Sequence, residues 1–211
     1  MAKPKKILSI IASPNNPSLS SAANIKVAEL LRKKYPNSEF TLVDLNNTPF
    51  ANNSLTVQSK PTFWTETESD YWIDKLKETD ILIISTPMIN FNYSGALKNF
   101  IDSICVADKS FTYKYVTKGA SRGLIDKLRV IIVATQGAPK GWYLFGDHVR
   151  NLKGTFRFLG AKKVNSLLID GTKVAPKNKM SFNDILAELE GEIEELVEKY
   201  LVLYSKEFMA V

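Results

Sequence analysis

The chain has 211 residues, of which 45% are hydrophobic and 24% charged, which suits a globular protein with a sizeable core. No run reaches the roughly 18 to 20 apolar residues of a membrane-spanning helix, and the apolar run 7–12 is too short for a secretory signal. The net charge is +6, but the lysines are scattered and 188–198 is acidic, whereas nucleic-acid-binding proteins concentrate positive charge on one face. We therefore expect a cytoplasmic protein with neither nucleic-acid nor membrane partners, and its one cysteine, Cys105, agrees with a reducing compartment.

Apolar runs of strand length alternate with helical patterns along the whole chain, without repeats or linkers, so one domain over 1–211 is expected. Strands are predicted over 7–12, 39–44, 81–85, 128–135 and 163–169, and helices over 20–34, 66–78, 94–105 and 143–159. A last helix starts at a capping box of Ser181 and Asp184 and carries an apolar stripe from Ile185 to Leu201. The pattern predicts an α/β fold whose five-stranded parallel sheet has helices on both faces. Ligands of such sheets bind beyond the carboxyl ends of the strands.

The loop after the first predicted strand, 13–21, runs directly into a helix. It lacks the glycine patterns of dinucleotide-binding Rossmann units and of P-loop NTPases. It offers hydroxyl groups instead, from Ser13, Ser18, Ser20 and Ser21. Backbone N–H groups and the positive end of the helix dipole favour a phosphate there, held without a metal. The alternative is an ordinary helix cap.

The loop after the third predicted strand mixes apolar and amide side chains. A planar aromatic ligand needs flat apolar contacts on its face and polar backbone groups at its edge. Met88, Ile89 and Phe91 can supply the first, and the backbone around Asn90 the second. The alternative is that Phe91 and Tyr93 are core residues and that Asn90 and Asn92 merely form a turn.

The loop after the fourth predicted strand begins Thr135-Gln136-Gly137-Ala138-Pro139. Gly137 allows a ligand to approach the backbone closely, and Thr135 or Gln136 could hydrogen-bond to the edge of a ring. The alternative is a simple turn. These three loops follow the strands beyond which this type of sheet binds its ligands.

The segment 86–102 has the sequence Thr-Pro-Met-Ile-Asn-Phe-Asn-Tyr-Ser-Gly-Ala-Leu-Lys-Asn-Phe-Ile-Asp. It resembles the flavin-loop signature of the FMN-dependent NADH:quinone oxidoreductases, also called azoreductases. The likeness extends over nearly the whole chain and includes the serine-containing first loop, the Phe111-Thr-Tyr element and the loop at Gln136-Gly137. The resemblance implies a flavodoxin-like homodimer with FMN held non-covalently near the subunit interface.

By matching position, the resemblance assigns cofactor contacts to each of the three loops. The phosphate falls to Ser13, Leu19, Ser20 and Ser21; the isoalloxazine to Met88, Ile89, Asn90 and Phe91; the far edge of the ring to Thr135, Gln136, Gly137 and Ala138. Two positions depart from the family pattern. Ile89 stands where many members have an aromatic residue, which bears on flavin stacking. Gln136 stands where an arginine is common, which bears on nicotinamide preference.

The chemistry implied is that of the cofactor. In that family, NADH or NADPH reduces the flavin and leaves, and a quinone or azo compound then takes two electrons, in ping-pong order. No catalytic side chain and no metal are expected. His148, the only histidine, falls within a predicted helix, where a structural role is favoured and a proton-transfer role remains open. Cys105 is expected to be a small buried apolar residue.

Three alternative functions fit the sequence less well. An NAD(P)H-dependent FMN reductase of the same fold would carry a glycine-rich pattern where this chain has the bulkier 88–91. A flavodoxin-type electron carrier would be strongly acidic, whereas this chain is basic. An acyl-carrier phosphodiesterase would need a metal or a nucleophile dyad, which one histidine and no clustered carboxylates do not favour.

Overall fold

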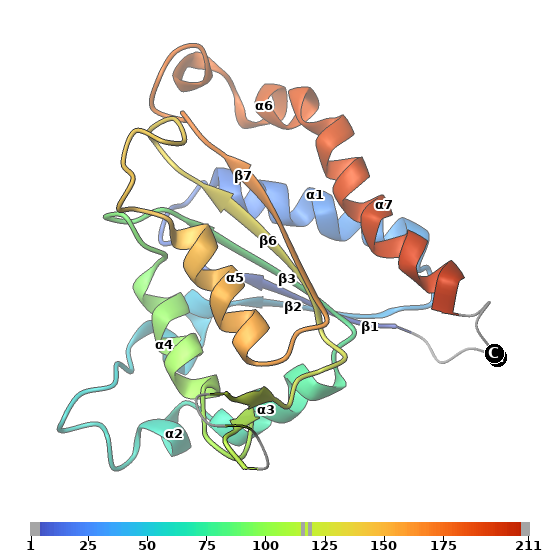
Figure 1. The fold of residues 1–211 in the computed structure, drawn as a ribbon. Helices are drawn as coiled ribbons and strands as arrows, with labels where there is room; N and C mark the ends of the chain where they lie inside the picture. Colours follow the sequence, from blue (N-terminus) through green and yellow to red (C-terminus); the bar gives the residue numbers. More distant parts are fainter. Residues whose placement is uncertain (1–4, 115–116, 118–119, 208–211) are drawn as a thin grey trace.

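The computed structural model describes residues 5–207 except 115, 116, 118 and 119. Five parallel strands form one sheet in the order β2-β1-β3-β6-β7 (Figure 1), which confirms the predicted flavodoxin-like α/β architecture. The strands are β1 (Lys6–Ile11), β2 (Glu39–Asp44), β3 (Ile81–Pro87), β6 (Arg129–Thr135) and β7 (Lys163–Ile169). From β1 the chain adds β2 on one side, and then β3, β6 and β7 on the other side. Where the direction of strand addition reverses in this way, a crevice opens beyond the carboxyl ends of the central strands.

The two central strands β3 and β6 are buried at every position. Continuous apolar runs are what a strand covered on both faces requires. Their register runs from Ile81 opposite Arg129 to Pro87 opposite Thr135, so both strands end level with each other. The ladder continues one residue further, since the Met88 N–H donates to the Thr135 carbonyl at 2.7 Å. The two loops that follow therefore leave the sheet side by side.

Helices cover both faces of the sheet (Figure 1). α1 (Leu19–Lys34), α6 (Phe182–Glu188) and α7 (Glu190–Glu207) pack on one face. α3 (Ser69–Glu78), α4 (Gly95–Ile104) and α5 (His148–Phe158) pack on the other. The short elements are α2 (Phe63–Glu66), three 3₁₀ turns (Leu45–Asn47, Pro49–Ala51, Lys177–Lys179) and the antiparallel pair β4 (Phe111–Thr112) and β5 (Arg122–Gly123). None of the helices in the described ranges is long and apolar enough to cross a membrane.

Two helix predictions need correction. The helix predicted over 143–159 begins only at His148, because the side chain of Asp147 caps it by accepting from the Arg150 N–H at 2.8 Å. The last helix is two helices that meet at Leu189, although its capping box of Ser181 and Asp184 is present as predicted. Its apolar stripe is buried at Ile185, Ile193, Leu196 and Val197, while the side chain of Leu201 lies outside the described part of the chain.

Candidate functional site

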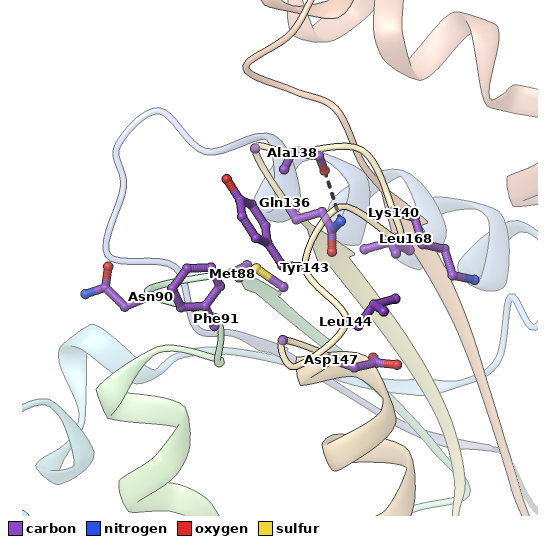
Figure 2. A pocket seen from close by; sticks show the side chains of 13 residues that line it. Met88, Asn90, Phe91, Gln136, Ala138, Lys140, Tyr143, Leu144, Asp147 and Leu168 are labelled. Atoms are coloured by element: carbon purple, nitrogen blue, oxygen red, sulfur yellow. Dashed lines mark hydrogen bonds between the residues drawn. The ribbon is translucent and has the colours of Figure 1, made fainter.

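The loops after β3 and β6 enclose one pocket of about 410 Å³ at the carboxyl edge of the sheet (Figure 2). The loop after β3 contributes Met88, Asn90 and Phe91, the loop after β6 contributes most of the segment 136–147, and β7 contributes Leu168. The volume lies in the range of small-molecule sites. Six residues predicted from separate loops therefore line one pocket: Met88, Asn90, Phe91, Gln136, Gly137 and Ala138.

The loop after β3 is a tight turn with an uncommon backbone. Ile89 and Asn92 exchange both backbone hydrogen bonds, at 2.7 and 3.0 Å. The two residues between them, Asn90 and Phe91, have φ of 45° and 71°, as in a type I′ turn. Asparagine adopts this left-handed conformation readily, but phenylalanine does so at a cost of about 1 to 3 kcal/mol. Neither residue's N–H is bound to an acceptor within the described chain, so both can donate to a ligand.

Phe91 lies on the surface and not in the core. It is 42% exposed, so the alternative that made it a core residue is wrong. Its ring contacts two aromatic rings of the loop after β6, Tyr143 at 5.3 Å and Phe145 at 4.7 Å between centroids. Gly146 makes this approach possible, because a Cβ there would lie 3.1 Å from the Cβ of Phe91. The turn after β3 thus forms an aromatic wall of the pocket together with the loop opposite.

The loop after β6 is clamped by the loop that follows β7. The carbonyls of Gln136, Gly137 and Ala138 accept from N–H groups of the segment 171–173 at 2.9 to 3.1 Å. The N–H groups of Gly137 and Ala138 have no acceptor within the described chain and remain available. Gly137 is required here, because a Cβ would lie 2.9 Å from the Lys173 side chain. The side chain of Gln136 donates to the Ala138 carbonyl at 2.9 Å and so rigidifies the loop.

The serine loop lies at the same edge of the sheet, outside this pocket. Ser18 caps α1 by accepting from the Ser21 N–H at 3.3 Å, so part of the capping alternative is correct. The N–H groups of Leu19 and Ser20 have no acceptor within the described residues and lie at the positive end of the helix dipole. The hydroxyl of Ser13 accepts from the Asn15 N–H at 3.1 Å. Donors remain available at this helix start after the cap is formed.

A buried polar network fixes the start of α1 over the strand ends. The Asn24 side chain accepts from the Ser9 hydroxyl and donates to the Ile10 carbonyl at 3.0 Å and to the Ser85 hydroxyl at 3.1 Å. All four groups are buried, and such networks are specific in geometry. The serine loop is thereby held at the edge where β1 and β3 end.

Besides the residues of the serine loop, two predicted site residues do not line the pocket. Ile89 opens the tight turn, and Thr135 is buried as the last residue of β6 with its carbonyl bound to Met88. The sequence interpretation also missed part of the pocket wall: Lys140, Gly141, Tyr143, Leu144, Gly146, Asp147 and Leu168. The signal was present, because two glycines bracket the aromatic run 142–145 and Gly141 has φ of 93°.

Neither a histidine nor a cysteine side chain lines the pocket. His148, next to it in sequence, is buried, and burial lowers its pKa from 6.5 to about 4. Neither of its ring nitrogens has a partner within the described residues. Cys105 packs against the core but is only partly buried, not buried as predicted, and this burial raises the pKa of its thiol to about 11. No group of three or more His, Cys, Asp or Glu residues that could hold a metal occurs among the described residues.

Comparison with known proteins places this site in context. A family model described as flavodoxin-like fold matches residues 5–193. An FMN-dependent NADH:quinone oxidoreductase 1 from Mesoplasma florum is 45% identical over 172 residues, which is 82% of this chain and 86% of the relative. An FMN-dependent NADH:quinone oxidoreductase from Metamycoplasma arthritidis is 44% identical over 90% of this chain and 96% of the relative.

Solved structures agree in fold. An azoreductase from Bacillus anthracis Sterne has a TM-score of 0.73 at 18% identity, over 92% of this chain and 99% of that one. An FMN-dependent NADH-azoreductase from Bacillus anthracis Ames Ancestor, solved in complex with FMN, has a TM-score of 0.73 at 21% identity, over 93% and 99% of the two chains.

Proposed function

The chain belongs to the FMN-dependent NADH:quinone oxidoreductases with the flavodoxin-like fold, and we propose that it binds FMN non-covalently and transfers electrons from a nicotinamide nucleotide to quinones. One observation carries the proposal. A pocket beyond the central strands combines an aromatic wall with four backbone N–H groups, at Asn90, Phe91, Gly137 and Ala138, that find no acceptor among the residues the structure describes.

The residues present fit FMN at both ends of the molecule. A flat ring needs apolar contacts on its face, which Met88 and Phe91 offer, and hydrogen-bond donors at its edge, which the unpaired N–H groups offer. A phosphate needs donors and positive potential, which the start of α1 offers through the N–H groups of Leu19 and Ser20 and the hydroxyl of Ser21. We propose that these groups hold the cofactor, together with Ser13, Ile89, Thr135 and Gln136.

When bound, FMN supplies two-electron chemistry between a hydride donor and an acceptor. The protein's part is to orient the substrates and to stabilise charge. The carbonyls of Gln136, Gly137 and Ala138 already accept hydrogen bonds from the neighbouring loop, so the backbone of this rim offers mainly N–H donors to a ligand. Preorganised N–H groups of this kind favour negative charge that develops during reduction. His148 is neutral at pH 7 and contributes no proton, because burial keeps its pKa low.

We propose ping-pong turnover with quinones and azo compounds as acceptors. The exposed ring of Phe91 lies beside Tyr143 and Phe145, and such a surface stacks flat aromatic molecules of either class. Donor and acceptor would use the same open side of the pocket in turn. The electron donor is NADH or NADPH.

We propose a homodimer in the cytoplasm. Leu144 and Phe145 are 92% and 76% exposed beside the pocket, and a run of exposed apolar residues of this kind favours a protein interface. A second copy of the chain would cover this run and part of the pocket.

The test is to record the visible spectrum of the purified protein and then NADH oxidation with menadione as acceptor. A flavin spectrum and steady-state turnover are expected. A colourless protein that does not bind added FMN at micromolar concentration would contradict the proposal. A flavodoxin-type carrier would bind FMN without turnover, and an FMN reductase would reduce free FMN faster than menadione.

A further inference from the structure

A second groove, of about 720 Å³, lies between α5 and the edge strand β7. Three of its residues, Arg150, Lys153 and Arg157, follow one another at helical spacing on α5 and share one stripe of the helix. Lys140 from the loop after β6 adds a fourth cation. Like charges at this spacing destabilise an isolated helix by a few tenths of a kcal/mol per pair. The helix dipole favours Arg157 in the last turn, but helix stability gives no reason for Arg150 and Lys153.

The positive charge of the groove is not neutralised by the chain itself. The side chains of Lys140, Arg150, Lys153 and Arg157 make no ion pair within the residues that the structure describes. The one carboxylate that lines the groove is that of Asp147, which caps α5. Burial, followed by the charge of Arg157, lowers the pKa of Lys153. An anion in the groove would relieve this repulsion.

Gly154 is a second, independent feature of the groove. It lies in the middle of α5, where glycine costs about 1 kcal/mol relative to alanine. A Cβ at this position would meet no atom within 4 Å, so the packing of the described chain does not require glycine. Because Gly154 lines the groove, the missing side chain leaves the surface of the helix open to a ligand.

The groove continues into the candidate active site. Lys140, Asp147 and Leu168 line both the groove and the pocket. Figure 2 shows these three residues at the end of the pocket opposite Asn90 and Phe91. A ligand that enters the pocket with a flat ring can therefore extend directly into the basic groove.

We propose that the groove binds the diphosphate of the nicotinamide dinucleotide while the nicotinamide lies in the pocket. This inference rests on the proposed function and names the part of the donor that the chain recognises. A diphosphate carries two negative charges, and Arg150 and Arg157 can each bind phosphate oxygens with two N–H groups. Lys140 and Lys153 add point charges on the same side. Quinones carry no such group, so the groove selects the donor and not the acceptor.

The test compares two donors with one variant of the FMN-loaded protein, Arg150→Gln combined with Lys153→Gln. An exposed ion pair contributes at most about fivefold in affinity, so the KM for NADH should rise about five- to twentyfold. The KM for 1-benzyl-1,4-dihydronicotinamide, which has no phosphate, should stay within about twofold by the same reasoning. Titration with ADP-ribose, followed by calorimetry, should show weaker binding to the same extent.

Two control variants make the test specific. Lys33→Gln with Lys75→Gln removes the same charge from the helix ends at the opposite edge of the sheet and should leave both donors unaffected. Arg150→Lys with Lys153→Arg keeps the charge but moves the guanidinium to position 153, so its KM for NADH should lie between those of the wild type and of the double glutamine variant. Equal changes for both donors, or an NADH effect no larger than that of the Lys33 and Lys75 control, would overturn the inference. Wild-type protein that oxidises neither donor would contradict the proposed function, and the ADP-ribose titration would still decide about the groove.

Discussion

Replacing Phe91 by alanine should weaken FMN binding much more than it destabilises the protein without FMN. Truncation of a core phenylalanine costs about 3 to 5 kcal/mol, but Phe91 is 42% exposed and contacts only the rings of Tyr143 and Phe145 among described aromatic residues. Loss of these ring contacts should cost about 1 to 2 kcal/mol. For a domain of this size that corresponds to a melting temperature lower by about 2 to 8 °C.

The expected effect on FMN is larger. The variant loses an aromatic contact with the flavin and the apolar area that the phenylalanine would bury against it. Aromatic stacking contributes about 0.5 to 1.5 kcal/mol and burial of the ring about 1 to 2 kcal/mol. The sum of about 2 kcal/mol corresponds to a roughly thirtyfold rise in the Kd for FMN. Quenching of FMN fluorescence measures the Kd, and thermal melting of the apo-protein measures stability.

Phe158 provides a matched control for this variant. It is 38% exposed and contacts one ring, that of Phe111, at 4.7 Å, and it does not line the pocket. Phe158→Ala should lower the melting temperature about as much as Phe91→Ala and leave the Kd for FMN unchanged. Equal Kd values for the two variants would refute the assignment of Phe91 as a wall of the flavin site. A large drop in melting temperature for Phe91→Ala alone would show that the turn is part of the structural core.

Three further predictions concern the phosphate, pH and the approach of the two loops. Ser20→Ala with Ser21→Ala should weaken the binding of FMN tenfold or more and that of riboflavin little, because hydrogen bonds to a charged group contribute about 1.5 to 3 kcal/mol each. If fluorescence titrations showed equal weakening for both ligands, this loop would not bind the phosphate. The pKa of His148 is about 4 in the folded protein and 6.5 when unperturbed. The free energy of unfolding should therefore be highest above about pH 6.5 and should fall by on the order of 3 kcal/mol as the pH drops toward 4, because only the unfolded state takes up the proton in this range. Urea unfolding should show this loss in the wild type and not in His148→Phe; identical pH profiles would contradict it. Gly146→Ala should raise the Kd for FMN, because its Cβ would lie 3.1 Å from Phe91 and push the aromatic wall aside, and an unchanged Kd would show that the wall tolerates this displacement.

The sheet could be predicted because its central strands appear in the sequence as continuous apolar runs. The apolar runs 81–85 and 128–135 correspond to β3 and β6, in which every residue is buried. A strand covered on both faces has no polar side, so the run itself marks it. The small pair β4 and β5 was not predicted as a sheet, because each strand has two residues and no periodicity can appear over that length.

The walls of the site were harder to predict, for a physical reason. The sequence predicts that the run Tyr143 to Phe145 starts a helix, yet these residues are exposed and α5 begins at His148. Aromatic residues at such spacing pack in a core in most helices, and the sequence alone does not show that the loop instead packs against Phe91. A turn at Asn90 was predicted as an alternative, but the left-handed backbone of Phe91 within it was hidden, because phenylalanine rarely adopts φ of 71°.

The hydrogen bonds of the loops explain why the site can bind a ligand through its backbone and does not depend on polar side chains. The carbonyls after β6 accept hydrogen bonds from the loop after β7, and in the turn after β3 the Ile89 carbonyl accepts one from the Asn92 N–H. The neighbouring N–H groups have no acceptor within the described residues. The excess of donors is therefore a property of the backbone and depends on the clamp between the loops and on the left-handed turn. Mutation of the Gln136 side chain removes one hydrogen bond within the loop after β6 but leaves these donors in place. Substitutions that change the backbone, at Gly137 or in the turn at Asn90, should therefore affect the flavin site more than the loss of any polar side chain that lines it.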